Sequence, residues 1–96
     1  MRVVAAVLRD ATGRVLVSQR PAGKHHAGFW EFPGGKLEAG ESARVGLDRE
    51  LREELGIEVR AAHELLTLEH EYPDKRVYLA VWTVDDHAGD VTAAEA

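Results

Sequence analysis

The amino-acid sequence predicts a single α/β domain in which a sheet lies between layers of helix. Apolar residues recur every four positions between Ser42 and Leu55, which is the spacing of one stripe along an α-helix. The residues from Arg76 to Val84 alternate instead, and both sets of alternating side chains are largely apolar. A strand that is apolar on both faces needs cover on both sides, which favours a sandwich architecture.

The N-terminal third is predicted to contain a hairpin, a loop and a short strand. Val3 to Leu8 has the composition of a buried strand, residues 10–13 that of a turn, and Val15 to Val17 that of the returning strand. Arg20 to Gly28 shows neither helical nor strand period and is predicted as a loop. Phe29 to Phe32 is expected to form a short strand that runs into a Pro-Gly-Gly sequence.

Favourable capping residues bound the predicted helix. Ser42 is a good N-cap, and Gly56 is a good residue to follow the last helical turn. The apolar stripe between them consists of Leu47, Leu51 and Leu55.

Further strands are predicted after the helix, at residues 57–59, 65–71 and 76–84. No repeat or linker divides residues 1–96, which predicts one domain. Only one convincing helix is found. Either the chain is therefore a fragment, or a loop or a partner subunit covers part of the sheet.

Charge and composition exclude several classes of function. The chain has 17 acidic and 12 basic residues, a net charge of −5, and no basic run of the kind that binds nucleic acid polymers or anionic membranes. The absence of cysteine excludes disulfides, thiolate nucleophiles and cysteine-based zinc sites, and it suits a reducing compartment. No stretch has the length of a membrane span or the form of a signal peptide. We therefore expect a cytoplasmic protein. The sequence does not specify its oligomeric state, and a monomer and a homodimer are both left open.

Three glutamates on the predicted helix indicate a cation site. Glu50, Glu53 and Glu54 stand at positions i, i+3 and i+4, so they fall within an arc of roughly 100°. Like charges at this spacing destabilise a helix, and hard divalent cations such as Mg²⁺ prefer oxygen ligands. Such ions would screen a polyphosphate from an acidic protein and lower the pKa of a bound water. The alternative is that the three side chains form a solvated helix face.

The residues around these glutamates carry a resemblance to a known family. Gly35 is followed after five residues by Glu41, and after seven more by the run from Arg49 to Ile57. This arrangement matches every specified position of the Nudix box, G-x5-E-x7-R-E-U-x-E-E-x-G-U with U aliphatic. The sequence therefore resembles the Nudix hydrolases, and among them the MutT-like nucleoside triphosphate pyrophosphohydrolases, along nearly its whole length.

The resemblance implies a fold and a metal cofactor. The fold would be an α/β/α sandwich around a mixed sheet, and residues 1–96 would lack its C-terminal strand and helix. The cofactor would be Mg²⁺, with Mn²⁺ as a substitute. Its ligands would be Glu50, Glu53, Glu54, the main-chain carbonyl of Gly34 and, from a later loop, Glu95.

The resemblance also implies roles for the residues around the ligands. Glu50 would be a ligand or the general base, Arg49 would orient the carboxylates, and Glu41 would brace the loop or touch the water shell of the metal. For Glu95 the alternative is a disordered terminal carboxylate.

Substrate contacts are implied for a further set of residues. Arg20 and His25 fall where MutT-like proteins approach the phosphates and the sugar, and Phe32 falls near the base. For these three the alternative is a place in the loop surface or the core, and Tyr72 to Lys75 is equally well explained as a plain turn. The full set of candidates is Arg20, His25, Phe32, Gly35, Lys36, Tyr72 and Lys75.

The activity implied is hydrolysis of a nucleoside triphosphate, such as 8-oxo-dGTP or another oxidised nucleotide, to a monophosphate and pyrophosphate by metal-activated water. A role in cleansing the nucleotide pool, and so in DNA repair, would follow. One alternative is another nucleoside diphosphate derivative as substrate, such as ADP-ribose or a dinucleoside polyphosphate. Another is a module that binds nucleotides without turnover.

Overall fold

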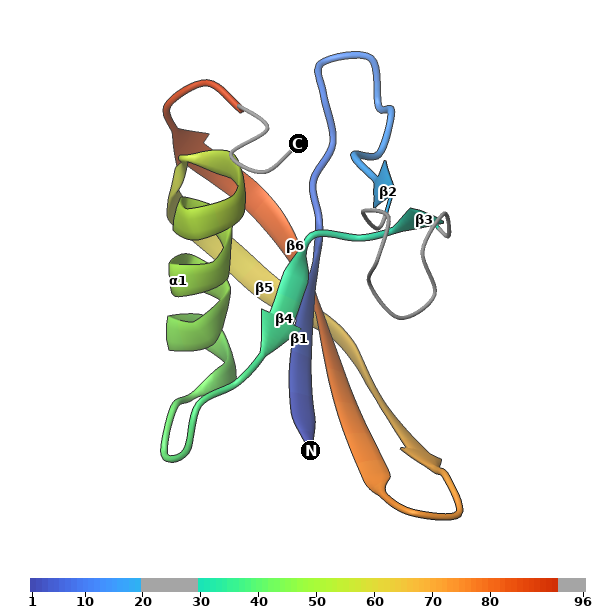
Figure 1. Cartoon of the computed structure of the whole chain (residues 1–96). Helices are drawn as coiled ribbons and strands as arrows, with labels where there is room; N and C mark the ends of the chain where they lie inside the picture. The colour runs from blue at the N-terminus through green and yellow to red at the C-terminus, as the bar shows by residue number, and fades with distance from the viewer. Residues whose placement is uncertain (20–29, 92–96) are drawn as a thin grey trace.

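A four-stranded mixed sheet forms the centre of the molecule. The computed structural model of the chain describes residues 1–19 and 30–91. The elements are, in chain order, β1 (Arg2–Val7), β2 (Ser18–Gln19), β3 (Trp30–Glu31), β4 (Gly34–Lys36), α1 (Ala43–Leu55), β5 (Glu58–Glu71) and β6 (Arg76–Ala88). The strand order in the main sheet is β4-β1-β6-β5, and β1 pairs parallel with β6 while the other neighbours are antiparallel (Figure 1). Strands β2 and β3 form a separate two-stranded sheet.

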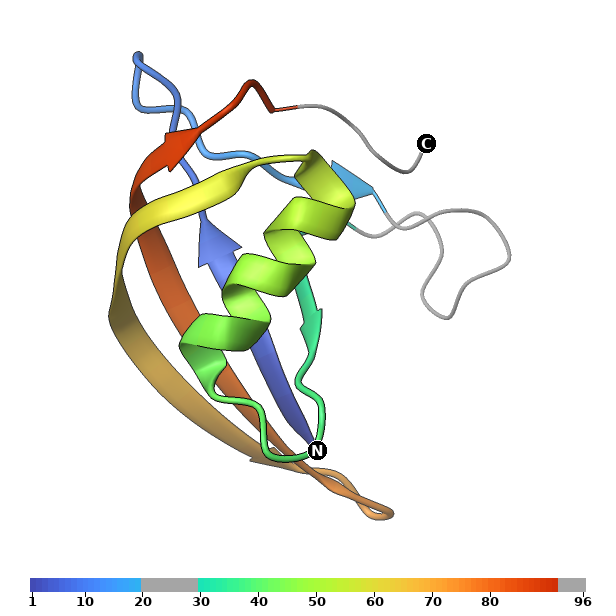
Figure 2. The same ribbon diagram turned by 90° about the vertical axis from the view of Figure 1, so that its left-hand side faces the viewer.

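Helix α1 lies across one face of the main sheet, as Figure 2 shows. The predicted stripe of Leu47, Leu51 and Leu55 is buried in one apolar cluster with Val4 and Ala6 of β1. Residues of β1 alternate between the two faces of the sheet, so Val4 and Ala6 belong to the face that α1 covers. This packing fixes the helix, and with it the glutamates, above the middle of the sheet.

Both predicted ends of the helix are confirmed. The Ser42 Oγ accepts a hydrogen bond from the Val45 N–H at 3.2 Å, which satisfies one of the free donors of the first turn. Gly56 has a φ of 70°, in the left-handed region, and its N–H donates to the Arg52 carbonyl at 3.1 Å.

The opposite face of the sheet is also apolar. Leu66 is paired with Val81 and Leu68 with Leu79, and Leu79 in turn lies opposite Val3 on β1. Residues directly opposite each other share a face, so this set lies on the side away from α1. Leu66 and Leu68 are exposed. The mixed sheet is therefore confirmed, whereas the second helical layer is not formed by the part of the chain that the structure describes.

The predicted returning strand of the N-terminal hairpin is wrong. Residues 15–17 make an isolated bridge between Arg9 and Val15 and one hydrogen bond from the Leu16 N–H to the Leu8 carbonyl at 2.8 Å. The turn itself is closed, because the Asp10 N–H donates to the Arg14 carbonyl at 2.9 Å and the Asp10 side chain accepts from the N–H groups of Thr12 and Arg14. The chain becomes a strand only at β2, which pairs with β3 rather than with β1.

Strands β4 and β5 also differ from the prediction. The two strands expected at residues 57–59 and 65–71 are one strand, β5, whose register shifts at three places. Bulges interrupt the alternation of side chains, which is why residues 60–64 carry no strand period. Strand β4 was not predicted because its first two residues are glycines, which are depleted in strands.

Candidate active site

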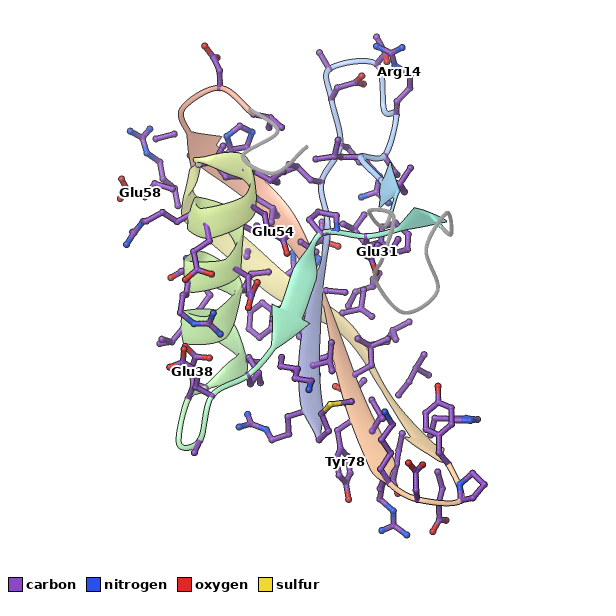
Figure 3. The ribbon with its side chains drawn as sticks, viewed as in Figure 1. Arg14, Glu31, Glu38, Glu54, Glu58 and Tyr78 are labelled. Carbon is purple, nitrogen blue, oxygen red and sulfur yellow. The ribbon has the colours of Figure 1, made fainter. Side chains whose placement is uncertain are left out.

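Strand β4 brings two glycines to the side of α1. Gly34 has a φ of 148°, and a Cβ at this position would lie 2.0 Å from the carbonyl oxygen of Val4. Only glycine therefore lets β4 approach β1 so closely. The Gly34 N–H donates to the Glu54 Oε2 at 3.2 Å, and Figure 3 shows Glu54 between α1 and β4.

Gly35 leaves room for the carboxylate of Glu50. A Cβ on Gly35 would lie 2.7 Å from both carboxylate oxygens of Glu50. Glu50 and Glu54 therefore stand at neighbouring backbone positions of β4, one turn apart along α1. The structure thus brings Gly35 close to Glu50 and Gly34 close to Glu54.

The Arg49 guanidinium is the centre of the charged network. It makes a two-bond contact with Glu41, from Nε to Oε2 at 2.9 Å and from Nη2 to Oε1 at 2.9 Å. Its Nη1 donates to the Glu50 Oε1 at 2.9 Å, and its Nη2 also donates to the Lys36 carbonyl at 3.0 Å. A planar guanidinium suits such paired contacts, so Arg49 ties the loop before the helix to one glutamate on it.

The Glu41 carboxylate stays charged at pH values well below those at which a glutamate ordinarily takes up a proton. The hydrogen bonds from Arg49 and then the one from the Glu38 N–H lower the pKa of the Glu41 carboxyl from 4.5 to about 2. The same contact with Glu41 raises the pKa of Arg49 further above its already high value. The Glu41 side chain is 9% exposed and that of Glu50 is 13% exposed, so this part of the network is largely shielded from solvent.

Glu53 differs from the other glutamates of the helix. Its side chain is 60% exposed, and its Oε2 lies 3.6 Å from the Arg49 Nη1. Within residues 1–19 and 30–91, no three histidine, aspartate or glutamate side chains stand close enough together to hold a metal ion. The helix thus carries the three predicted carboxylates without gathering them at one point.

The donor set nevertheless fits a hard divalent cation. All candidate donors are carboxylate or carbonyl oxygens, which are the ligands that Mg²⁺ prefers. Four carboxylates, those of Glu38, Glu41, Glu50 and Glu53, lie within 3.6 Å of the single Arg49 guanidinium. Arg49 and Arg2, which also acts on the Glu41 carboxylate, offset only part of this negative charge, so a cation is electrostatically favoured beside it.

The predicted substrate-binding residues are spread over the molecule. Lys36 and Phe32 are exposed and lie next to the glycines of β4. Tyr72 and Lys75 form the tight turn between β5 and β6, which in Figures 1 and 2 lies at the end of the molecule opposite the end of α1 that carries Glu54. The Lys75 Nζ lies over the Tyr72 ring there, 5.6 Å from the ring centre. Arg20, His25 and Glu95 lie outside the described residues.

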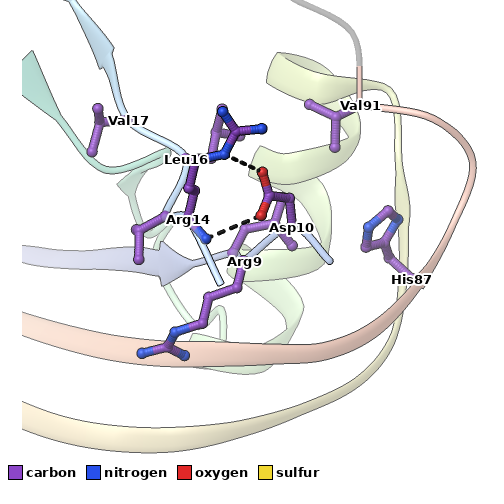
Figure 4. Close-up of a pocket in the computed structure, with 9 residues that line it drawn as sticks. Arg9, Asp10, Arg14, Leu16, Val17, His87 and Val91 are labelled. Atoms are coloured by element: carbon purple, nitrogen blue, oxygen red, sulfur yellow. Dashed lines mark hydrogen bonds and ion pairs between the residues drawn. The ribbon is translucent and has the colours of Figure 1, made fainter. Parts of the chain in front are cut away.

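A cavity of about 450 Å³ lies away from the glutamates. Figure 4 shows it between the segment after β1 and the end of β6, with His87 on one side and the ion pair of Arg14 and Asp10 on the other. Its walls are mainly aliphatic, and none of the predicted metal ligands that the structure describes lines it. The contacts between the glutamates of α1 and the glycines of β4 lie outside this cavity.

Sequence reasoning missed three contributors to the site. Glu38 and the carbonyl of Lys36 contact Arg49, and the side chain of Arg2 holds the main chain of Glu41. Two of these contacts use backbone atoms, which no residue pattern reveals. Arg2 lies outside the motif, and only the pairing of β1 with β4 brings it to the loop.

A comparison with protein families finds a match over almost the whole chain. The family model described as "NUDIX domain" matches residues 1–95. The chain is 40% identical over 92 residues to an 8-oxo-dGTP diphosphatase of Proteus vulgaris, covering 96% of this chain and 82% of that protein. It is 43% identical over 95 residues to a CTP pyrophosphohydrolase of Escherichia coli, covering 99% and 70%.

Solved structures agree with the fold. The solution structure of the E. coli ORF135 protein is similar with a TM-score of 0.82 and 43% identity, over 96% of this chain and 65% of that one. A structure from work on MutT of Aliivibrio salmonicida and Vibrio cholerae has a TM-score of 0.82 and 32% identity, over 99% and 74%. In the part of the chain that the structure describes, no helix has the length and apolar character of a membrane span.

Proposed function

The chain belongs to the NUDIX family of hydrolases, and from this membership we propose that it hydrolyses a nucleoside triphosphate to a monophosphate and pyrophosphate. The foremost substrate is an oxidised guanine nucleotide such as 8-oxo-dGTP. Cleavage of the phosphoric anhydride would remove the damaged nucleotide from the pool.

The observation that carries the proposal is the excess of carboxylate around Arg49. Four carboxylates lie within 3.6 Å of one guanidinium, and that of Glu50 lies beside the backbone of Gly35. A polyphosphate would be repelled by this charge unless divalent cations lay between the two. Glu53 and Glu54, with the carbonyl of Gly34, would hold Mg²⁺ or Mn²⁺ there. The bound cation would neutralise phosphate charge and make a water molecule more acidic.

Hydrogen bonds hold the carboxylates of Glu50 and Glu54 in place. The Gly34 N–H holds one oxygen of Glu54, and Arg49 holds the Oε1 of Glu50. Among the described residues, no hydrogen-bond partner is found for the Oε2 of Glu50. We assign this oxygen as the acceptor of the proton from the attacking water, since a free carboxylate oxygen at this position is a suitable base. Glu53 is 60% exposed, and its contact with Arg49 is longer, at 3.6 Å.

A second substrate is favoured by a specific observation. The relative with 43% identity is named a CTP pyrophosphohydrolase, whereas the relative with 40% identity is named an 8-oxo-dGTP diphosphatase. These identities are too similar to separate a pyrimidine from an oxidised purine. CTP is therefore the second candidate, with the same chemistry at the anhydride.

A product-resolved substrate screen tests the proposal. Purified chain is incubated with Mg²⁺ and 8-oxo-dGTP, dGTP, CTP or ADP-ribose, and the released pyrophosphate and monophosphate are measured. The variant Glu54→Gln is compared with wild type, and Glu58→Gln serves as the control because Glu58 is an exposed glutamate at the start of β5. We expect Glu54→Gln to lose at least about 100-fold in rate, since even outer partners of metal ligands are worth roughly 10- to 100-fold.

Two outcomes would contradict the proposal. If a folded sample binds nucleotides but releases no product from any of them, the chain is a binding module. If Glu54→Gln is as active as Glu58→Gln, Glu54 does not belong to the metal site.

A further inference from the structure

The side chain of Arg2 reaches the loop that precedes the helix. Its Nη1 donates to the carbonyl oxygen of Glu41 at 2.8 Å, and its own carbonyl accepts from the Leu37 N–H at 2.9 Å. Arg2 is the first residue of β1, between β4 and β6 in the sheet. Both ends of the segment from Leu37 to Glu41 are therefore bonded to one residue of the central sheet.

Arg49 holds the same loop from the side of the helix. It bonds the carboxylate of Glu41 and, just before the loop, the carbonyl of Lys36. Within the loop, the Glu38 N–H donates to the Glu41 Oε1 at 2.9 Å. Figure 3 shows Glu38 where this loop leads into α1. Two arginines that are 47 positions apart in the chain, one on β1 and one on α1, thus hold one short loop.

The hydrogen bonds from Arg2 and from Arg49 are made to different parts of Glu41. Arg2 fixes its main chain, whereas Arg49 needs its carboxylate in one orientation to form both bonds of 2.9 Å. A main-chain displacement of even a few tenths of an ångström would lengthen one of the two bonds, because the fork of a guanidinium is rigid. Arg49 in turn holds Glu50 through its Nη1.

We propose that Arg2, which lies outside the Nudix box, is a positioning residue that sets the orientation of Glu50 through Glu41 and Arg49. The proposal rests on the proposed function, since its consequence for activity requires the metal-dependent site. Its structural part, the fixing of Arg49, is independent of any metal.

The test compares Arg2→Met with Arg2→Lys and with Arg14→Met. Lysine keeps a charged donor for the Glu41 carbonyl, and Arg14 is a matched exposed arginine that pairs with Asp10 on a distant turn. The first readout is the NMR signal of the Arg49 Nε–H, whose exchange with solvent reports its bond to Glu41. The second is Mn²⁺ affinity, measured by electron paramagnetic resonance, and the third is the Mg²⁺ concentration that gives half-maximal hydrolysis.

We expect Arg2→Met to speed exchange of the Arg49 Nε–H and to weaken Mn²⁺ binding by roughly fivefold, the worth of one hydrogen bond of ordinary strength. Arg2→Lys should recover most of this loss, and Arg14→Met should match wild type. In a Glu41→Gln background, Arg2→Met should change Mn²⁺ affinity by less than about 1.5-fold, because the connection to Arg49 is already weakened there.

Several results would overturn the proposal. If Arg2→Met has the same Arg49 Nε–H exchange rate and the same Mn²⁺ affinity as wild type, the hydrogen bond from Arg2 to Glu41 has no effect on Arg49. An equal fivefold loss in the Glu41→Gln background would show that Arg2 acts by another route. If wild type itself binds no Mn²⁺ and cleaves no nucleotide, the proposed function fails, while the Arg49 signal still decides whether Arg2 positions that residue.

Discussion

At the scale of single residues, the neighbouring glycines of β4 are required for different reasons. A Cβ on Gly35 would meet the Glu50 carboxylate at 2.7 Å, whereas a Cβ on Gly34 would meet the Val4 carbonyl at 2.0 Å on a backbone with a φ of 148°. We expect Gly35→Ala to lower activity by tenfold or more, about 1.4 kcal/mol, by displacing Glu50.

Gly34→Ala should instead lower the free energy of unfolding by about 2 kcal/mol or more.

Urea unfolding and nucleotide hydrolysis, measured on both variants, separate the two effects. The interpretation of Gly35 fails if Gly35→Ala keeps wild-type activity, or if its whole loss follows from unfolding.

The low pKa of Glu41 predicts how stability changes in acid. Because its pKa is about 2 in the folded chain and near 4.5 ordinarily, the unfolded state binds the proton more readily. The contribution of the contact between Glu41 and Arg49 is therefore fully present above about pH 4.5, and it is lost as the pH falls from there toward 2.

Thermal midpoints measured in steps between pH 6 and 2.5, at about constant ionic strength, test this expectation. Wild type should lose more stability over this range than Glu41→Gln, which has no charge to lose at that position. Glu58→Gln, at a residue with no such contact, should follow wild type. Parallel curves for wild type and Glu41→Gln would rule out a stabilising role for the charged form of Glu41.

The motif located the charged residues, but it did not reveal all of their partners. The structure places Arg49 in contact with Glu41 and Glu50, both of which the Nudix box specifies, while their catalytic roles stay predictions. The carbonyls of Lys36 and Glu41 also hold the network. A backbone carbonyl belongs to every residue type, so the sequence carries no mark of which one is used.

At the scale of elements, the cap of α1 matters because the helix begins at the loop that carries Glu41. The Ser42 Oγ accepts from the Val45 N–H, and without it a donor of the first turn loses its partner. We expect Ser42→Ala to lower the free energy of unfolding by about 1 kcal/mol, within the range of 0.5–2 kcal/mol for such changes. Ser42→Asp retains an acceptor and adds a charge favoured at a helix N-terminus, so it should stay within about 0.5 kcal/mol of wild type. Urea unfolding measures both, and an equal loss in the two variants would contradict the capping role.

The helix was predictable from the sequence to within one residue at each end, because its signals are local. The leucine stripe, Ser42 and Gly56 specify it without reference to any other segment. Strands depend on partners that are distant in the chain. Residues 15–17 have the composition of a strand but find only one bridge, whereas Gly34–Lys36 lacks that composition and is a strand because β1 pairs with it.

At the scale of the whole molecule, the alternation in β6 correctly indicated a sheet with two apolar faces. The alternation did not specify what lies on each face. In the structure α1 covers one face, and the other carries exposed leucines of β5. Membership of the hydrolase family and the mixed sheet are both confirmed by the comparisons. The parallel pairing of β1 with β6 joins residues that are 76 positions apart, and no local pattern specifies such a partner.

The acidic balance of the chain leads to a prediction about its stability with cations. The chain has a net charge of −5, and four carboxylates share one guanidinium beside α1. A cation that binds only the folded state stabilises it, by about 1.4 kcal/mol at ten times its dissociation constant. For a domain of this size we expect MgCl₂ to raise the thermal midpoint by roughly 6–11 °C over NaCl of equal ionic strength. Scanning calorimetry should show a smaller rise in Glu54→Gln, and equal midpoints in the two salts for wild type would mean that the glutamates of α1 bind no Mg²⁺ without nucleotide.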